Sequence, residues 1–374
     1  MTSSEKNGIM KTLYYDEAKF PYIREYALSP PNDKSLSADK NFYTDWRKTM
    51  KKFLSILLAA LMCFSMLALT ACDTTKDDGK YVVGICQLLP HPALDAATQG
   101  FIDTLKAELG EENVTFLKEN AGNEIPVCTT IITNLVNKNV DLIMANATPA
   151  LTAAVNGTSK IPVLGTSITE YGTALGIDNF NGLVGGNVSG TSDLAPLDQQ
   201  AQMIIDLFPD AKTVAMLYSI GEANSKYQVR VVREYLEGKG ITVVDKAFTD
   251  SNDVSTVAAA AAAEADVIYI PTDNTAAGCT QTINGVIGNT PVVAGEEGIC
   301  AGCGVVTLSI SYYDLGVATG MMAAKILRGE ADISEMPIEY AATFTKKYNA
   351  EKCAQLGIDT AKLDAEGYVA ISND

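Results

Sequence analysis

The sequence is poor in histidine, tryptophan and basic residues. It holds one histidine, His91, and one tryptophan, Trp46, in 374 residues. A Ser-His-Asp triad would have to use His91, and the sequence contains no G-x-S-x-G motif. Histidine and cysteine residues lack the spacing of a zinc site, and there is neither a Walker A motif nor a G-x-G-x-x-G after a predicted strand. We therefore expect no enzymatic activity, no metal and no cofactor.

Basic residues are outnumbered by acidic ones. The sequence has 28 Lys and Arg against 45 Asp and Glu, a formal net charge of −17. A surface of this sign repels nucleic acid and anionic lipid. We expect no nucleic-acid partner, and any membrane attachment must come from something other than a basic patch.

Long apolar runs are also scarce, and the one that stands out is Phe53–Ala68. Lys51 and Lys52 precede it, and Leu69-Thr70-Ala71-Cys72 follows it. A charged start, an apolar middle and small residues before a cysteine are typical of a lipoprotein signal peptide with its lipobox. This pattern predicts lipidation of Cys72 and an extracytoplasmic protein, lipid-anchored to the bacterial cell membrane. The alternative is a single membrane-spanning helix, since the run is near the roughly 20 residues that a span needs.

The segment before the signal is polar and has no sustained period of a helix or strand. Residues 1–49 are therefore predicted to have no core of their own. They are either an extension from an upstream start, with Met50 as the true first residue, or a cytoplasmic extension. Residues 50–72 are the predicted signal peptide, and residues 73–79 are a short tether.

Six cysteines follow Cys72, too scattered for the disulfide framework of a small secreted domain. Only Cys300 and Cys303 have C-x-x-C spacing. We interpret this pair as a local disulfide or as two ordinary thiols, because no thioredoxin-like context surrounds it.

From Lys80 the sequence alternates short β-type runs with helical patterns at a spacing of 20–30 residues. This alternation is typical of an α/β fold with a parallel sheet covered by helices. It occurs twice, separated by the Gly, Asn and Ser-rich stretch 176–192, which is a candidate hinge. We expect two similar lobes. The predicted strands are 81–86, 113–117, 141–145, 161–164, 213–218, 241–246, 266–270, 291–294 and 305–309. The predicted helices are 93–109, 124–138, 149–155, 194–208, 222–237, 254–265, 275–287, 312–327 and 350–356.

The loops that follow these strands are rich in Ser, Thr and Asn and contain no arginine. Ligands of parallel sheets bind where the strands end. Hydroxyls, amides and helix N-termini can hold a carboxylate there, while Asp273, Glu222 and Glu296 can meet an ammonium group. The pattern suits a zwitterion such as an amino acid. The alternative is that these residues only cap helices, which accounts for any one loop but not for seven.

Seven ordered motifs between the lipobox and about Leu327 resemble the family of ABC-transporter substrate-binding proteins associated with tryptophan and tyrosine uptake. They are Gln87…His91-Pro-Ala-Leu-Asp95, Asn146–Leu151, Asn187–Asp193, Glu222–Ser225, Pro271–Thr275, Gly295–Gly298 and Tyr312–Gly316. The resemblance implies a type I periplasmic-binding-protein fold, in which two Rossmann-like lobes with parallel sheets are joined by a multi-strand hinge. The first lobe would comprise 80–190 and 311–333, and the second 191–310 and 334–374. The segment 338–344 and the last helix would complete the second lobe, and helix 312–327 would pack on the first.

The resemblance also implies a function and a site. The protein would be the solute-binding lipoprotein of an ABC importer, taking a small zwitterion, with an aromatic amino acid as the first candidate. Its partners would be an ABC permease and, through Cys72, the membrane, and we expect a monomer. The alternatives are a receptor for a sugar, nucleoside or peptide signal, or a surface redox or hydrolytic lipoprotein. Asp273 is expected to meet the ammonium, and hydroxyls and helix N-termini the carboxylate. The predicted ligand-binding residues are Gln87, Asn146, Thr148, Ser167, Thr191, Ser192, Asp193, Ser219, Asn224, Ser225, Asp273, Asn274 and Glu296.

Overall fold

The computed structural model describes residues 80–372. The predicted extension, signal peptide and lipidated Cys72 lie outside these residues. Within residues 80–372, no helix is long and apolar enough to cross a membrane.

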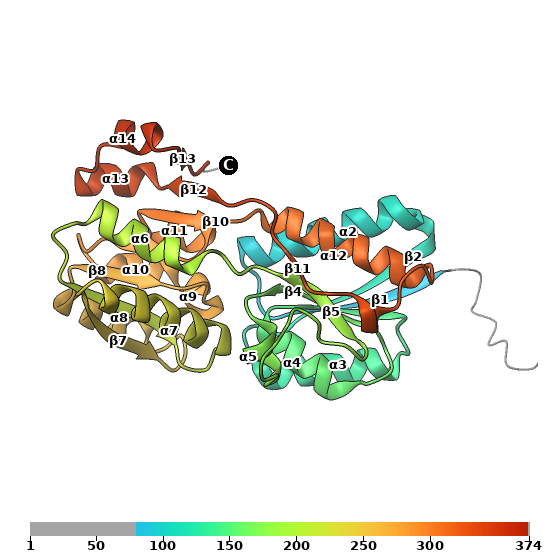
Figure 1. Ribbon diagram of the computed structural model, residues 1–374. Coiled ribbons are helices and arrows are strands. Elements are labelled where there is room, and N and C mark those ends of the chain that lie inside the picture. The colour runs from blue at the N-terminus through green and yellow to red at the C-terminus, as the bar shows by residue number, and fades with distance from the viewer. Residues whose placement is uncertain (1–79, 373–374) are drawn as a thin grey trace, which may run out of the picture. The chain divides into compact units, whose positions relative to one another are not determined.

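The first sheet is parallel throughout and has the strand order β11-β5-β4-β3-β1-β2. Helices α2 and α12 cover one face, and α3, α4 and α5 lie toward the other (Figure 1). Consecutive residues of β3 point to opposite faces, so Ile143 belongs to one hydrophobic core and Met144 to the other. The strands are β1 (Tyr81–Gln87), β2 (Val114–Asn120), β3 (Leu142–Asn146), β4 (Val163–Ile168), β5 (Val188–Ser192) and β11 (Glu339–Tyr340). The helices are α2 (Pro92–Leu109), η2 (Glu111–Asn113), α3 (Ile125–Asn137), α4 (Thr148–Gly157), α5 (Tyr171–Leu175), α12 (Tyr312–Leu327) and η3 (Ile333–Glu335).

The second sheet has the order β13-β12-β10-β9-β8-β6-β7 and is parallel except where β12 runs antiparallel to β10. Two hydrophobic cores again lie on its two faces. The strands are β6 (Thr213–Ser219), β7 (Thr242–Phe248), β8 (Val267–Ile270), β9 (Val292–Ala294), β10 (Val306–Ser309), β12 (Thr345–Tyr348) and β13 (Val369–Ala370). The helices are α6 (Leu197–Leu207), α7 (Ala223–Gly238), α8 (Val254–Glu264), α9 (Asn274–Gly278), α10 (Thr280–Val286), α11 (Glu297–Cys303), α13 (Ala350–Leu356) and α14 (Thr360–Ala365).

The two sheets share one topology. The order β2-β1-β3-β4-β5 in the first is repeated as β7-β6-β8-β9-β10 in the second. This is a doubly wound order, with ligand sites expected at the carboxyl ends of the strands. The predicted fold class, two parallel α/β lobes, is confirmed.

Helix α12 follows the second round of strands but packs along α2 of the first lobe, as predicted. The two backbones approach closely through glycines. A Cβ at Gly316 would lie 2.0 Å from the carbonyl oxygen of Ala97, and one at Gly100 would lie 2.2 Å from that of Tyr313. Only glycine fits these positions, so α12 is held tightly against the first lobe.

The predicted hinge at 176–192 is wrong at its C-terminal end, because residues 188–192 form the buried strand β5. The strand was not predicted because its sequence, VSGTS, is mostly small and polar and resembles a loop. Its buried hydroxyls find partners on neighbouring elements: Ser189 donates to the carbonyl of Met336, and Thr191 pairs with Thr319 of α12. Residues 191 and 192 therefore belong to the first sheet and not to the second lobe.

A second correction concerns the segment 334–340, which was assigned to the second lobe. Strand β11 instead pairs with β5 of the first sheet, and Ile338 packs in the hydrophobic core of that lobe. From β12 onward the chain belongs to the second sheet. The chain thus passes between the sheets after β5, before α12 and after β11.

One predicted helix of the second lobe is divided, and helix α11 was not predicted. The predicted helix 275–287 is two helices, α9 and α10, which meet at Cys279. The segment with the C-x-x-C spacing is helix α11, which Glu296 caps through the N–H groups of Gly298 and Ile299. Cys300 and Cys303 are buried free thiols on this helix.

Candidate ligand-binding site

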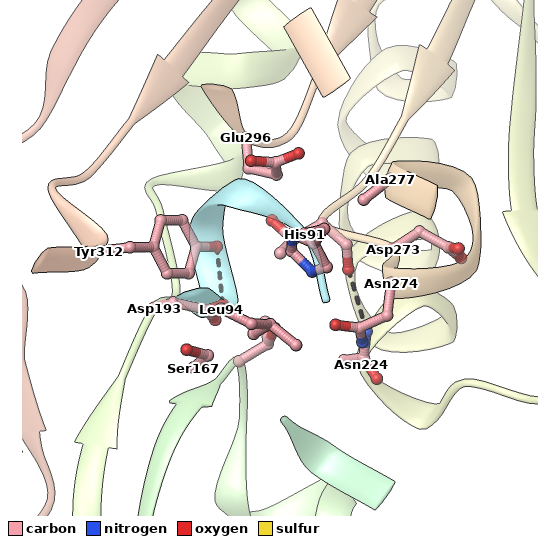
Figure 2. Close-up of a pocket in the computed structure, with 12 residues that line it drawn as sticks. His91, Leu94, Ser167, Asp193, Asn224, Asp273, Asn274, Ala277, Glu296 and Tyr312 are labelled. Carbon is pink, nitrogen blue, oxygen red and sulfur yellow. Dashed lines mark hydrogen bonds between the residues drawn. The ribbon is translucent and has the colours of Figure 1, made fainter. Parts of the chain in front are cut away.

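A small cavity lies at the carboxyl ends of strands from both sheets. Figure 2 shows its lining side chains. The interior volume of the cavity is about 10 Å³, which is room for about one water molecule, so an amino acid can enter only where the walls move apart. It is lined by His91, Leu94, Ser167, Thr169, Asp193, Asn224, Thr272, Asp273, Asn274, Ala277, Glu296 and Tyr312.

Ser167 is aimed into the cavity by an irregularity in β4. The register of β4 against β5 shifts between Gly165 and Ile168, and Ser167 has a φ of +56°. A bulge of this kind re-aims a side chain, and a positive φ is unusual for serine. The buried Ser167 hydroxyl has no hydrogen-bond partner among residues 80–372. Backbone strain of this sort is found at functional sites.

Asp193 directly follows β5 and lies beside Ser167 in the cavity (Figure 2). Its Oδ2 accepts a hydrogen bond from the hydroxyl of Tyr312, the first residue of α12, at 2.9 Å. Its Oδ1 is buried and accepts no hydrogen bond of standard geometry in the described part of the chain, although the Thr169 side chain lies near enough to lower the pKa of this carboxylate in part. Burial raises the pKa of Asp193, because a carboxylate without a counter-charge is poorly solvated there.

The first turn of α2 forms another part of the wall. His91 is the N-cap residue of this helix, Pro92 occupies its first turn, and Leu94 lines the cavity. Neither ring nitrogen of His91 makes a hydrogen bond of standard geometry within residues 80–372, although Asn274 lies near enough to the ring to raise its pKa in part. Burial lowers the pKa of His91, so the ring is neutral at pH 7. The N–H groups of a helix start carry partial positive charge and favour an anion.

The second-lobe wall is organised around Glu222, which precedes α7. Its carboxylate accepts hydrogen bonds from the side chain of Asn224 and from the backbone and side chains of Asn274 and Thr275. These five donors tie the start of α7 to the start of α9. Glu222 therefore acts as a structural brace and does not line the cavity.

Asp273, the N-cap residue of α9, is also well satisfied. Its Oδ2 accepts from the Ser219 N–H and the Ser225 hydroxyl, both at 2.7 Å, and its Oδ1 from the Ala276 N–H at 2.8 Å. Burial, together with the neighbouring charge of Glu222, raises the pKa of Asp273 to about 8.

Glu296 closes the wall opposite the start of α2. Burial raises its pKa to about 7. No lysine or arginine of residues 80–372 lines the cavity. The site therefore gathers three buried acidic groups, Asp193, Asp273 and Glu296, without a protein cation, and it favours a ligand that brings a positive group of its own.

The structure brings six of the thirteen predicted site residues into the cavity wall. They are Ser167, Asp193, Asn224, Asp273, Asn274 and Glu296. The other seven do not line it: Gln87, Asn146, Thr148, Thr191, Ser192, Ser219 and Ser225.

The residues outside the wall mostly support it. Gln87, Thr98 and Asn146 form a buried network: the Thr98 hydroxyl donates to Gln87, and Asn146 donates to Thr98 and to the carbonyl of Leu94. This network fixes the first turn of α2 against β1 and β3. Ser219 and Ser225 hold Asp273, as described above.

Six cavity residues were not among the predicted site residues: His91, Leu94, Thr169, Thr272, Ala277 and Tyr312. Position offered a signal for two of them. His91 stands in the loop after β1 and directly before a helix, and Tyr312 is the first residue of the helix after β10. Leu94 and Ala277 are ordinary helix residues whose sequence context gives no such sign.

The cysteines lie away from the cavity wall. All six in residues 80–372 are free thiols, and Cys300 and Cys303 are buried in a hydrophobic core of the second lobe and do not line the cavity. Burial raises the pKa of Cys303 to about 12, which disfavours the reactive thiolate. The described residues also contain no group of three or more His, Cys, Asp or Glu side chains that could hold a metal ion.

Two α/β lobes of one topology, with a small polar cavity at their strand ends, define the type I periplasmic-binding-protein fold. The chain belongs to the ABC transporter substrate-binding protein family, whose model matches residues 82–363. It is thus a substrate-binding protein of an ABC transporter and not an enzyme.

Individual relatives agree with this assignment. The chain is 32% identical over 340 residues to the tyrosine-binding protein of Clostridioides difficile, covering 87% of this chain and 97% of the relative. It is 30% identical to an ABC domain of Streptococcus pneumoniae solved in complex with L-Trp, with a TM-score of 0.73, 78% of this chain and all of that chain being covered. A conserved domain protein of Vibrio cholerae gives 28% identity and a TM-score of 0.74, with the same coverage.

Proposed function

We propose that this protein captures an aromatic amino acid in the cavity between its lobes and delivers it to an ABC permease. The observation that carries the proposal is where unpaired polar atoms gather. Seven buried side-chain polar atoms of residues 80–372 lack a hydrogen-bond partner, and five of them belong to the cavity residues His91, Ser167, Asp193 and Asn224. Buried polar groups are normally paired, so this cluster is built for a ligand that pairs them.

Asp193 is the residue we assign to the ligand ammonium. The sequence pattern favoured Asp273, but both oxygens of Asp273 already accept hydrogen bonds from the protein. Asp193 has one unpaired oxygen at the cavity. An ammonium placed there would supply the missing counter-charge and hydrogen bond together.

We assign the ligand carboxylate to hydrogen-bond donors beside Asp193. Ser167 offers a free hydroxyl next to Asp193, and the first turn of α2 offers backbone N–H groups near Leu94. Neutral donors of this kind hold a carboxylate without a formal cation. The pairing of acceptor and donors side by side suits the α-amino and α-carboxyl groups of an amino acid.

An aromatic side chain is favoured by the relatives and compatible with the wall. One relative is named for tyrosine binding and another was solved with L-Trp. The ring of Tyr312 and the side chains of Leu94 and Ala277 provide apolar surface in the cavity. An aromatic ring prefers such contacts.

The cellular setting belongs to the same proposal. The sequence pattern supports a signal peptide at 50–72, lipidation at Cys72 and a tether at 73–79, which would keep a monomeric protein on the outer side of the bacterial cell membrane beside its permease. Residues 1–49 would not form part of the mature protein. Ligand contacts from both lobes would favour a closed conformation that the permease recognises.

Titration calorimetry of the purified protein tests the ligand class. The panel contains tyrosine, tryptophan, phenylalanine, leucine, a hexose and a nucleoside, together with tyramine and deaminated tyrosine. We expect binding of aromatic amino acids, and weak or no binding of the two analogues that each lack one charged group. Binding of only the hexose or the nucleoside would instead support a sugar or nucleoside receptor.

A further inference from the structure

A hydrogen bond between two side chains joins the two lobes beside the cavity. Asn123 lies in the turn between β2 and α3 of the first lobe, and Thr275 lies in the first turn of α9 of the second. The side-chain nitrogen of Asn123 donates to the hydroxyl of Thr275 at 3.1 Å. Neither residue lines the cavity, so this bond connects the lobes without occupying the space of a ligand.

The hydroxyl of Thr275 can act only as the acceptor in this bond. Its one proton is donated to Oε1 of Glu222 at 2.8 Å, and the Thr275 N–H donates to the same oxygen at 2.9 Å. The Thr275 side chain is buried. Asn123, Thr275 and Glu222 therefore form a chain of hydrogen bonds that ends on a carboxylate, an arrangement in which each bond strengthens the next. The group that fits Thr275 from the first lobe is a donor.

The backbone holds Asn123 in place for this contact. Its φ is +68°, a left-handed conformation that asparagine tolerates better than most residues. Its N–H donates to the carbonyl of Leu88 at 2.9 Å. Leu88 directly follows β1 and belongs to the loop that leads to His91 of the cavity wall. The donor is thus tied to the same loop as the first-lobe wall of the cavity.

The other end of α9 also contacts the first lobe. A Cβ at Gly278, the last residue of α9, would lie 3.2 Å from Cδ1 of Leu89. Since the interior of the cavity measures only about 10 Å³, an amino acid passes in or out only when the lobes separate. Separation breaks the bond from Asn123 to Thr275, whereas the bond from Thr275 to Glu222 lies within the second lobe and is kept.

We propose that Asn123 is a positioning residue for ligand retention, which stabilises the closed state by donating to Thr275 and makes no contact with the ligand. This inference rests on the proposed function, since it names a residue that sets how long the captured amino acid stays bound. A contact made only in the closed state stabilises that state alone. Asn123 should therefore slow ligand release and leave association, which begins from the open state, unchanged.

A single hydrogen bond sets the size of the effect. Asn123→Gly should raise the dissociation rate of tyrosine by about 2- to 10-fold, the equivalent of one hydrogen bond between uncharged groups. Glycine adopts a positive φ without strain, so this variant keeps the turn and removes only the amide. Asn123→Asp should release tyrosine at least as fast as Asn123→Gly, because its carboxylate would face a hydroxyl whose proton is held by the charged Glu222.

The experiment measures the release of radiolabelled tyrosine into an excess of unlabelled tyrosine, and the dissociation constant by calorimetry. The association rate follows from the two values. The proteins are the unmodified one, Asn123→Gly, Asn123→Asp and Asn139→Gly. Asn139 is the matched control, because it is an exposed asparagine in the turn after α3 with a φ of +52°, and its N–H donates to the Val136 carbonyl of the same lobe.

Faster release from both Asn123 variants, with an unchanged association rate and normal release from Asn139→Gly, is the expected result. An unchanged release rate in Asn123→Gly would overturn the inference and leave the proposed function standing. Release from Asn123→Asp as slow as from the unmodified protein would also overturn it, because a carboxylate cannot donate to Thr275. Absence of tyrosine binding by the unmodified protein would instead remove the proposed function, and this inference with it.

Discussion

Replacing Asp193 by asparagine tests the assignment of the ligand ammonium most directly. The substitution keeps the size and the oxygen that accepts from Tyr312, but removes the negative charge. In the variant, the ammonium of a bound amino acid would be buried without a counter-charge. Removing one member of a buried charge pair costs about 2–5 kcal/mol, which corresponds to roughly 30- to 5,000-fold weaker binding of tyrosine.

Deaminated tyrosine provides the contrasting ligand. In the unmodified protein, deaminated tyrosine binds weakly because it brings no positive group to the buried charge of Asp193. The Asp193→Asn variant has no such charge. Asp193→Asn should therefore leave its affinity unchanged or improve it. Opposite effects on the two ligands cannot arise from general damage to the fold.

Proton linkage gives a second readout of the same assignment. Burial raises the pKa of Asp193 in the free protein, and an ammonium bound beside it would lower that pKa again. Tyrosine binding should therefore release protons and weaken as the pH falls through the raised pKa. Both effects should be absent from Asp193→Asn.

Calorimetry in buffers of different ionisation enthalpy measures affinity and proton release together. Asp198→Asn is the matched control, since Asp198 is an exposed aspartate in the first turn of α6, and it should behave like the unmodified protein. Tyrosine binding within about threefold of the unmodified value in Asp193→Asn, well below the expected loss, would refute the assignment. Equal losses for tyrosine and its deaminated analogue would refute it too.

Three further predictions concern stability and attachment. The pKa of Glu296 is raised from 4.5 to about 7, so the folded protein binds this proton more tightly than the unfolded chain does. The unfolding free energy should therefore fall by roughly 3 kcal/mol as the pH rises from about 4.5 to about 7. Urea unfolding of Glu296→Gln should lack that loss. Gly316→Ala should lower the unfolding free energy by roughly 1–3 kcal/mol or more, because its Cβ meets the Ala97 carbonyl, whereas Gly238→Ala, with open space around it, should not. Cys72→Ala should abolish palmitate labelling but leave ligand binding intact; a variant that still labels would refute lipidation at this residue.

Much of the fold could be predicted from sequence because most strands and helices have a recognisable pattern within their own residues. Apolar runs such as that of β3 and periodic helices such as α2 carry the pattern within their own residues. Strand β5 does not, because its polar side chains are satisfied by Met336 and Thr319, which lie far along the chain. The lobe of β11 is wrongly predicted for the same reason, because β11 pairs with β5, whose sequence does not indicate a strand.

The site shows the same limit at the level of single residues. Sequence places Asn146 and Asn224 alike, each near the start of a helix after a strand. The side-chain nitrogen of Asn146 donates to Thr98 and to the Leu94 carbonyl away from the cavity wall, whereas Asn224 lines the cavity. Which amide faces a ligand depends on partners that only the folded chain supplies.

The roles of the four buried carboxylates follow from how many protein donors each already has. Glu222 accepts five hydrogen bonds, Asp273 three, Glu296 two and Asp193 one. A carboxylate with several donors is stabilised by the protein and gains little from a ligand, while one with a bare oxygen gains the most. The better satisfied three also stand at helix starts, where they join α7 to α9 and cap α9 and α11. Recognition of a positive ligand group is therefore left to Asp193, whose position after β5, next to the strained Ser167, puts acceptor and donor within reach of one amino acid backbone.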